Sequence, residues 1–175
     1  MDLSALEKYD SQKMYTIYDR WAEIARESFE SEQDEVNFED INHIVFAGMG
    51  GSGTIGDIFA AVLSKSNIHV NVVKGYILPK TVNSNTLVVV TSVSGDTAET
   101  LSVLESAQKL NSKIIAFSSG GKMLEYCIKN KIQHRIISQY HSPRASFTSY
   151  LYTILKILHS TLKIKQEEER IGDNK

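Results

Sequence analysis

The chain has 175 residues, 42% of them hydrophobic, and a formal net charge of -2. This length predicts a single domain with a sizeable core, and the near-neutral charge argues against nucleic-acid binding, which depends on neutralising phosphates. No apolar run approaches the roughly 20 residues of a membrane-spanning helix, and the N-terminus lacks signal-peptide features, so we expect a cytoplasmic protein without membrane contact. The lone Cys127 excludes an internal disulfide, and we expect a buried thiol rather than a metal ligand.

The N-terminal segment is predicted to form a helix that packs on the core. Its apolar residues recur at three- and four-residue spacing, which places on one face Met14, Ile17, Tyr18, Trp21, Ile24 and Ala25. An acidic connector follows and completes an N-terminal region that we bound at residues 1–39.

The rest of the chain alternates between strand-like and helix-like segments. The strand-like runs cover residues 43–48, 69–73, 86–92, 113–119 and 132–138, and the intervening helix-like segments cover 54–65, 96–110 and 121–130. A closing helix is predicted from Pro143 onward. This alternation predicts an α/β fold, a three-layer α/β/α sandwich around a five-stranded parallel sheet, over residues 40–162. Residues 163–175 are charged and are interpreted as a tail or linker.

The first strand ends in GMGGSGTIGD, residues 48–57, which contains the spacing GxGxxG. A dinucleotide site would also need an acidic residue about 20 positions further on, where this chain has Lys74 instead. A P-loop needs a lysine where Thr54 stands. The glycines still allow a close approach of the backbone to an anion at the start of a helix, where Ser52 adds a hydroxyl.

The third strand ends in TSVSGDTAET, residues 91–100, which opens the next helix in the same manner. We interpret Asp96 and Glu99 as a capping box. Capping leaves Ser92, Ser94 and Thr97 without a structural reason.

Strand order decides whether these two loops meet. In an open sheet of order 2-1-3-4-5, ligands bind where the connections from strands 1 and 3 diverge. That order would bring Ser52, Ser92, Ser94 and Thr97 together beside two helix N-termini. Neutral hydroxyl donors suit a phosphate monoester, because each hydrogen bond to a charged group contributes about 1.5–3 kcal/mol.

Four motifs in order, GMGGSGTIGD, SVSGDTAETL, FSSGGKM and SPRAS, resemble the N-terminal half of the bifunctional phosphoglucose/phosphomannose isomerases, and the likeness runs from about residue 40 to about residue 160. Those enzymes contain two SIS (sugar isomerase) domains. The resemblance implies a flavodoxin-like SIS domain that binds a phosphorylated hexose and, without metal or cofactor, helps to interconvert glucose 6-phosphate or mannose 6-phosphate with fructose 6-phosphate through an enediol. It also implies a role in glycolysis or gluconeogenesis.

The resemblance assigns roles to individual residues. It implies that the phosphate is bound by Ser52, Ser92, Ser94 and Thr97, with the backbone of Gly50 and Gly51 beside the sugar. Arg144 of the PRA motif would stabilise the charge that develops on the enediolate, which is sound because a fixed guanidinium stabilises the transition state more than the ground state. The alternative for Arg144 is a surface salt bridge at a helix start.

The family's proton-transfer glutamate, its ring-opening histidine and a late lysine belong to the second SIS domain, and no position in this chain matches them. Among the histidines, His141 is the one placed to reach the crevice; Glu99 and Glu125 are not convincing bases. Losing such a base typically costs about 10²–10⁴ in rate. The sequence therefore supports binding more strongly than turnover.

Four hypotheses remain open. The first is the phosphate-binding half of a phosphoglucose/phosphomannose isomerase, which acts with a second SIS domain or as a homodimer. The second is a non-catalytic SIS module that senses a phosphosugar or mediates assembly. A single-domain isomerase whose base comes from an adjacent subunit is third, and a nucleotide-binding domain is last.

Overall fold

The computed structural model describes residues 8–164, so the final residues of the predicted charged tail lie outside the described part. Its centre is a five-stranded, all-parallel sheet of order β2-β1-β3-β4-β5. The strands are β1 (His43–Gly48), β2 (His69–Val73), β3 (Thr86–Thr91), β4 (Lys113–Ser118) and β5 (Gln133–Ile136). The predicted fold class and the strand order on which the site prediction depended are both confirmed.

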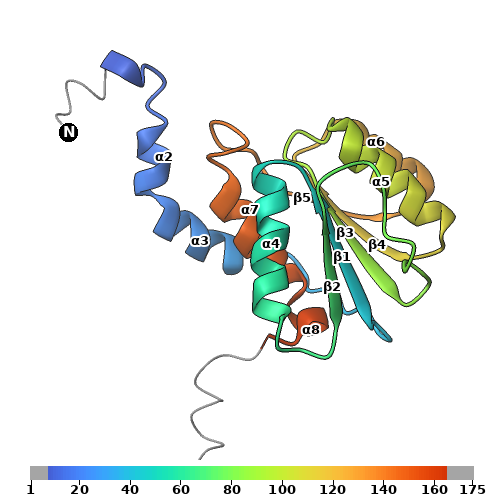
Figure 1. Cartoon of the computed structure of the whole chain (residues 1–175). Helices are drawn as coiled ribbons and strands as arrows, with labels where there is room; N and C mark the ends of the chain where they lie inside the picture. The colour runs from blue at the N-terminus through green and yellow to red at the C-terminus, as the bar shows by residue number, and fades with distance from the viewer. Residues whose placement is uncertain (1–7, 165–175) are drawn as a thin grey trace, which may run out of the picture.

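Helices cover both faces of the sheet and form the predicted three layers (Figure 1). One face carries α4 (Gly51–Leu63) and α7 (Phe147–Ile157), and the other carries α5 (Ala98–Lys109) and α6 (Gly121–Asn130). A short α8 (His159–Leu162) follows α7. The strands β1 and β3 are buried along their whole length, which explains why their sequences are nearly continuous runs of apolar β-formers.

Alternate residues of the central strands point into the two halves of the core. Phe46 and Val89 pack with Phe59 of α4 and Tyr150 of α7, while their neighbours on the same strands pack against α5 and α6. The second half includes Cys127, which is buried as expected, and burial raises the pKa of its thiol to about 11.

The helix predicted over residues 14–25 is divided in the described part of the chain into α2 (Tyr15–Asp19) and α3 (Trp21–Phe29). The break lies at Arg20, whose backbone has φ -92° and ψ 5° and whose N–H donates to Ile17 three residues back. In Figure 1, α3 lies against α7 and α2 extends away from the sheet. Ile24 is fully buried there, as predicted. We name residues 14–29 the N-terminal arm.

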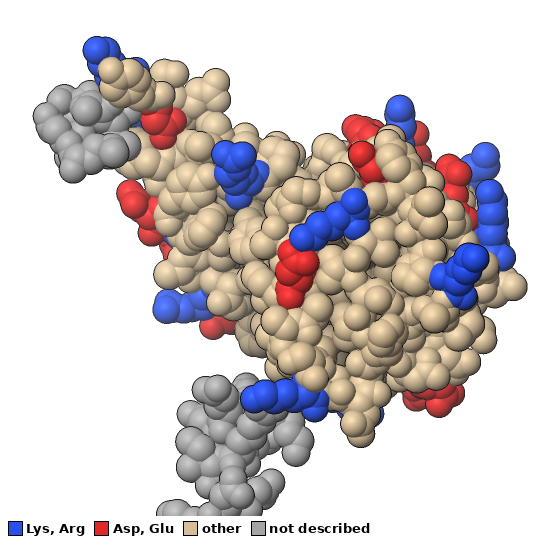
Figure 2. Space-filling view, in the orientation of Figure 1, with Lys and Arg blue, Asp and Glu red and all other residues tan. Residues whose placement is uncertain are grey.

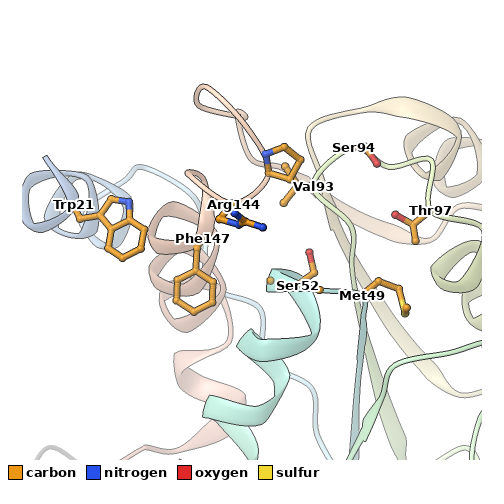
Figure 3. A pocket seen from close by; sticks show the side chains of 11 residues that line it. Trp21, Met49, Ser52, Val93, Ser94, Thr97, Arg144 and Phe147 are labelled. Atoms are coloured by element: carbon orange, nitrogen blue, oxygen red, sulfur yellow. The ribbon is translucent and has the colours of Figure 1, made fainter. Parts of the chain in front are cut away.

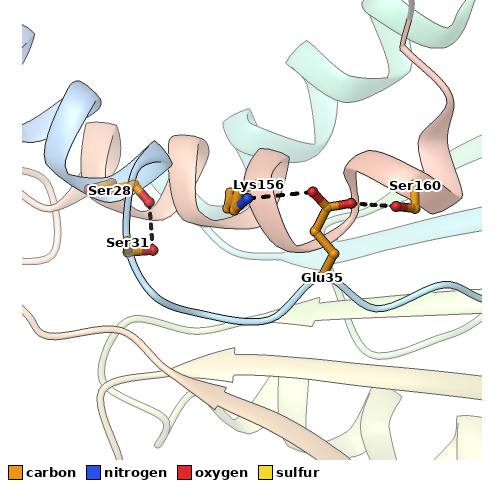
Figure 4. Close-up of polar contacts among 5 residues, drawn as sticks. All are labelled: Ser28, Ser31, Glu35, Lys156 and Ser160. Atoms are coloured by element: carbon orange, nitrogen blue, oxygen red, sulfur yellow. Dashed lines mark hydrogen bonds and ion pairs between the residues drawn. The ribbon is translucent and has the colours of Figure 1, made fainter.

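The acidic connector is fixed along α7 and α8 (Figure 4). The carboxylate of Glu35 lies 3.4 Å from Nζ of Lys156 and accepts a hydrogen bond from Ser160. The backbone N–H of Val36 donates to the carbonyl of Ile157 at 2.8 Å. These contacts attach the connector to the domain; the predicted domain boundary at residue 39 stays a prediction.

Charged side chains of both signs lie scattered over the face shown in Figure 2, several of them as neighbours of opposite sign. None of the helices in residues 8–164 is long and apolar enough to span a lipid bilayer.

Candidate functional site

A cavity of about 470 Å³ opens at the carboxyl ends of β1 and β3, where the predicted crevice lies. The loop after β1, the loop after β3, the turn before α7 and the N-terminal arm surround it (Figure 3). Its lining residues are Trp21, Met49, Gly50, Gly51, Ser52, Val93, Ser94, Thr97, Pro143, Arg144 and Phe147. Parallel strands place both loops at one edge of the sheet, which is why segments 40 residues apart share a site.

The first loop presents the start of α4 to the cavity. Gly50 precedes the helix with φ 52° and ψ -126°, a conformation that favours glycine because other residues meet steric resistance there. The backbone N–H groups of Gly53 and Thr54 donate to carbonyls within the turn, so those of Gly51 and Ser52 lie before the first intrahelical bonds. This end of α4 therefore offers backbone donors and a favourable dipole to an anion.

The second loop presents hydroxyls at the start of α5. Ser94 is exposed and Thr97, the residue before the helix, is half-buried; both line the cavity. Ser92 behaves differently: its side chain is buried, and its hydroxyl lies 2.9 Å from that of Thr97 and accepts a bond from the Gly95 N–H at 3.1 Å. Of the four predicted phosphate-binding hydroxyls, Ser52, Ser94 and Thr97 line the cavity and Ser92 lies behind them.

The predicted capping box at Asp96 and Glu99 is wrong. The helix α5 is preceded by Thr97, without a side-chain capping bond. Asp96 instead accepts a hydrogen bond at 3.0 Å from the backbone N–H of Lys122, in the first turn of α6. The N–H of Met123 also donates to the carbonyl of Gly95. The loop after β3 is therefore held by the first turn of α6.

Arg144 lies in the turn before α7, because the helix begins at Phe147 and not at Pro143 as predicted. Figure 3 shows the guanidinium extending from this turn toward the side of the cavity that carries Ser52. The ion pairs formed within residues 8–164 do not include Arg144. Arg144 is also the one charged side chain among the described residues that line the cavity. This placement supports a role toward an anionic ligand over a surface salt bridge.

The structure places several other candidate groups away from the cavity. His141, the histidine placed nearest the predicted crevice, is exposed and is not among the lining residues of the cavity. His134 is hydrogen-bonded to Ser118, 2.8 Å away, and burial lowers the pKa of its imidazole. Glu99 and Glu125 are not among the lining residues. Across residues 8–164, no cluster of three or more His, Cys, Asp or Glu could hold a metal ion.

Five lining residues were not predicted as part of a site: Trp21, Met49, Val93, Pro143 and Phe147. Phe147 is the first residue of α7 and packs near Gly51, whose added Cβ would lie 3.9 Å from its ring. The helical spacing of Trp21 matches that of the other apolar residues of the arm and predicts core packing. Periodicity identifies the inward face of a helix but does not distinguish a core from the wall of a cavity.

Comparison with known proteins places this geometry in a family. A family model described as SIS domain matches residues 37–159. The bifunctional phosphoglucose/phosphomannose isomerase of Caldicellulosiruptor bescii is 38% identical over 130 residues, which are 74% of this chain and 38% of that enzyme. The D-glucosamine-6-phosphate 4-epimerase of Sulfolobus acidocaldarius is 30% identical over 92% of this chain and 52% of its own length. The chain thus spans between about a third and a half of these relatives.

Solved structures share the fold. A glucosamine-6-phosphate deaminase from Thermotoga maritima superimposes with a TM-score of 0.62 at 20% identity, over 89% of this chain and 51% of that one. The C-terminal domain of glucosamine-fructose-6-phosphate aminotransferase from Francisella tularensis also gives 0.62, at 17% identity, over 91% and 53% of the two chains. The resemblance found in the sequence motifs is confirmed, and the chain belongs to the SIS domain family.

Proposed function

We propose that this chain is the phosphosugar-binding SIS domain of an aldose–ketose isomerase that interconverts glucose 6-phosphate or mannose 6-phosphate with fructose 6-phosphate. The observation that carries the proposal is the cavity itself. Three hydroxyls and the N-terminal end of α4 lie on one side of it, and a cationic side chain, Arg144, approaches from another. This arrangement suits one phosphate and one further site of negative charge.

The phosphate occupies the side of the cavity formed by Ser52, Ser94 and Thr97. Their hydroxyls donate to its oxygens, and the N–H groups of Gly51 and Ser52 add backbone donors at the positive end of the α4 dipole. In this proposal Ser92 does not contact the phosphate; its hydroxyl holds the hydroxyl of Thr97 in place. Gly50 allows the backbone to approach the sugar without a side chain in the way.

Arg144 acts on the sugar end. Isomerisation through an enediol puts negative charge on an oxygen near the first two sugar carbons, and a guanidinium fixed in that direction lowers the barrier by stabilising the charge. The transfer of a proton between the two carbons needs a base. The described lining residues include no carboxylate or imidazole, so in this proposal the base comes from a residue outside the lining, on a second SIS domain or a second copy of the chain.

The name of the Caldicellulosiruptor relative supports the substrates and the reaction. A homodimer or a partner SIS domain, a cytoplasmic location and a role in glycolysis or gluconeogenesis belong to the same proposal. The alternative, an SIS module that binds a phosphosugar without chemistry, is favoured by the same lining, which offers groups for binding and none for proton transfer.

The test is to incubate the purified chain with fructose 6-phosphate and follow glucose 6-phosphate and mannose 6-phosphate by NMR, with a binding titration in parallel. We expect binding that Ser94→Ala weakens about tenfold or more, since a hydrogen bond to a charged group contributes about 1.5–3 kcal/mol. Ser64→Ala, at the far end of α4, is the matched control. Turnover that Arg144→Ala abolishes would support an isomerase whose base is supplied by a second copy of the chain. Binding without turnover would support either an isomerase domain that needs a second SIS domain or the non-catalytic module, and no binding would reject both.

A further inference from the structure

Trp21 is the only tryptophan of the chain, and it stands in the wall of the cavity. It is the first residue of α3, so it comes from the N-terminal arm and not from the sheet or its loops. Figure 3 shows its indole beside Phe147, on the side from which Arg144 extends. The arm therefore reaches the same cavity as the two hydroxyl-bearing loops.

The indole contacts the turn that carries Arg144. Its Nε1–H donates to the backbone carbonyl of Ala145 at 3.3 Å, and Ala145 is fully buried. The ring also lies against Phe147, with centroids 6.3 Å apart, and against Tyr18, at 5.0 Å in an edge-to-face arrangement. Ala145, the residue after Arg144, is thus hydrogen-bonded to Trp21, 124 positions earlier in the sequence.

A second contact holds the other end of the same turn. The hydroxyl of Ser142 lies 3.7 Å from the sulfur of Met14, and it accepts the N–H of Ala145 at 3.3 Å. The N–H and the hydroxyl of Ser146 both donate to the carbonyl of Ser142. Arg144 itself is exposed, so its direction depends on the backbone of a turn that the arm touches on both sides.

We propose that Trp21 is a positioning residue: by holding the carbonyl of Ala145 it fixes the turn at residues 143–146 and keeps the guanidinium of Arg144 directed at the bound phosphosugar. The ligand in this proposal is taken from the proposed function. The structural part, the attachment of the turn by Trp21, does not depend on that function. A displacement of about 1 Å in a charged group can cost up to about 10²-fold in rate, so a turn fixed at both ends has a direct effect on the site.

The structural part is tested without ligand. The chain gives a single indole N–H signal in a ¹⁵N NMR spectrum, because it has one tryptophan. We expect this proton to exchange with solvent at least about tenfold more slowly than that of a free indole, because it is hydrogen-bonded to the carbonyl of the buried Ala145. Exchange at the rate of a free indole would overturn the proposal, whatever the chain binds.

The functional part is tested by a double-mutant cycle on fructose 6-phosphate affinity. Trp21→Phe keeps an aromatic ring and removes the N–H, and we expect affinity to fall about two- to tenfold, the effect of one net hydrogen bond. In an Arg144→Ala background the same change should have no further effect, because Trp21 acts through Arg144. Phe29→Leu, at the other end of α3, is the control and should bind as the unaltered chain does.

Equal losses in both backgrounds would show that Trp21 contacts the ligand or supports the fold independently, and would overturn the positioning role. Failure of the unaltered chain to bind fructose 6-phosphate would reject the proposed function, and the indole exchange rate would then decide the inference alone. The two failures are therefore distinguishable.

Discussion

The hydroxyl of Ser92 lies 2.9 Å from the hydroxyl of Thr97, so a buried serine and a cavity-lining threonine form one unit. Ser92 also accepts the N–H of Gly95, which ties the strand end to the loop that carries Ser94. The two serines are separated by a single residue but have different roles: Ser94 lines the cavity, and Ser92 stabilises the loop by hydrogen bonds.

Ser92→Ala is expected to lower both stability and ligand affinity. Its removal takes away the partner of the half-buried Thr97 hydroxyl and one of the two acceptors of the Gly95 N–H, which keeps the carbonyl of residue 92, so the loss costs about 0.5–1.5 kcal/mol. Ser94→Ala, at an exposed position, should weaken binding and leave the free energy of unfolding within about 0.5 kcal/mol. Urea denaturation and a fructose 6-phosphate titration of both variants check this. Equal stabilities for the two variants would contradict the supporting role of Ser92.

Gly95→Ala is expected to destabilise the chain by about 2–5 kcal/mol. Gly95 has φ +75°, which costs other residues about 1–2 kcal/mol, and a Cβ there would stand 1.9 Å from the carbonyl oxygen of Gly120. The loop must move, and Ser94 moves with it. Gly75→Ala is the matched control because its added Cβ meets no atom within 4 Å. Equal melting temperatures for the two variants would refute the packing argument.

Tyr150→Phe is expected to cost about 1–3 kcal/mol although it removes a single oxygen. The Tyr150 hydroxyl, fully buried in α7, donates to the carbonyl of Ile137 at 2.9 Å and lies 3.4 Å from that of Val93. Its loss leaves a buried acceptor without a donor. Tyr152→Phe, half-buried on the same helix, should change stability by less than about 0.5 kcal/mol. Comparison of the two midpoints in urea measures the difference.

Stability is expected to fall as the pH drops from about 7.5 to about 5.5, and His134 should account for part of the fall. Burial and the neighbouring Arg135 lower the pKa of this imidazole below its ordinary value of 6.5. The unfolded chain therefore takes up a proton at a higher pH than the folded chain, so the free energy of unfolding decreases as the pH falls through 6.5 and levels off, for this group, below the folded-state pKa.

The variant His134→Gln isolates this contribution. A glutamine amide can keep a hydrogen bond to Ser118 but does not titrate, so the dependence of unfolding on pH in this range should become shallower. An unchanged slope would show that other groups produce the whole effect.

Much of the fold could be predicted from the sequence, because the signals are local. The buried strands β1 and β3 read as continuous apolar runs, and glycine- and serine-rich turns mark where they end. The expected strand order 2-1-3-4-5 then indicated which loops meet. The bounds of β1, β2 and α6 agree with the predicted ranges, since each begins or ends at a clear change of composition.

The remaining features depend on contacts between distant segments. The spacing of Asp96 resembles that of a capping residue, but its carboxylate accepts the backbone N–H of Lys122, 26 residues later, and nothing in the local sequence indicates that partner. The same holds for Trp21, whose hydrogen bond to Ala145 converts an apparent core residue into part of the site. The start of α7 was placed early because proline favours a first helical turn, whereas Pro143 here lies in the turn that shapes the approach of Arg144.

The hydrogen bond from the backbone N–H of Lys122 to the carboxylate of Asp96 places a negative charge at the start of α6. The positive end of α6 already receives an anion, and that anion is a carboxylate of the chain itself. In the proposed function an incoming phosphate would meet competition there, whereas α4, which has no acidic residue in its first turn, presents its positive end to the cavity beside neutral hydroxyls. The protein thus carries its own counter-ion at the start of α6, and in the proposed function this favours the start of α4 as the place where a phosphate binds.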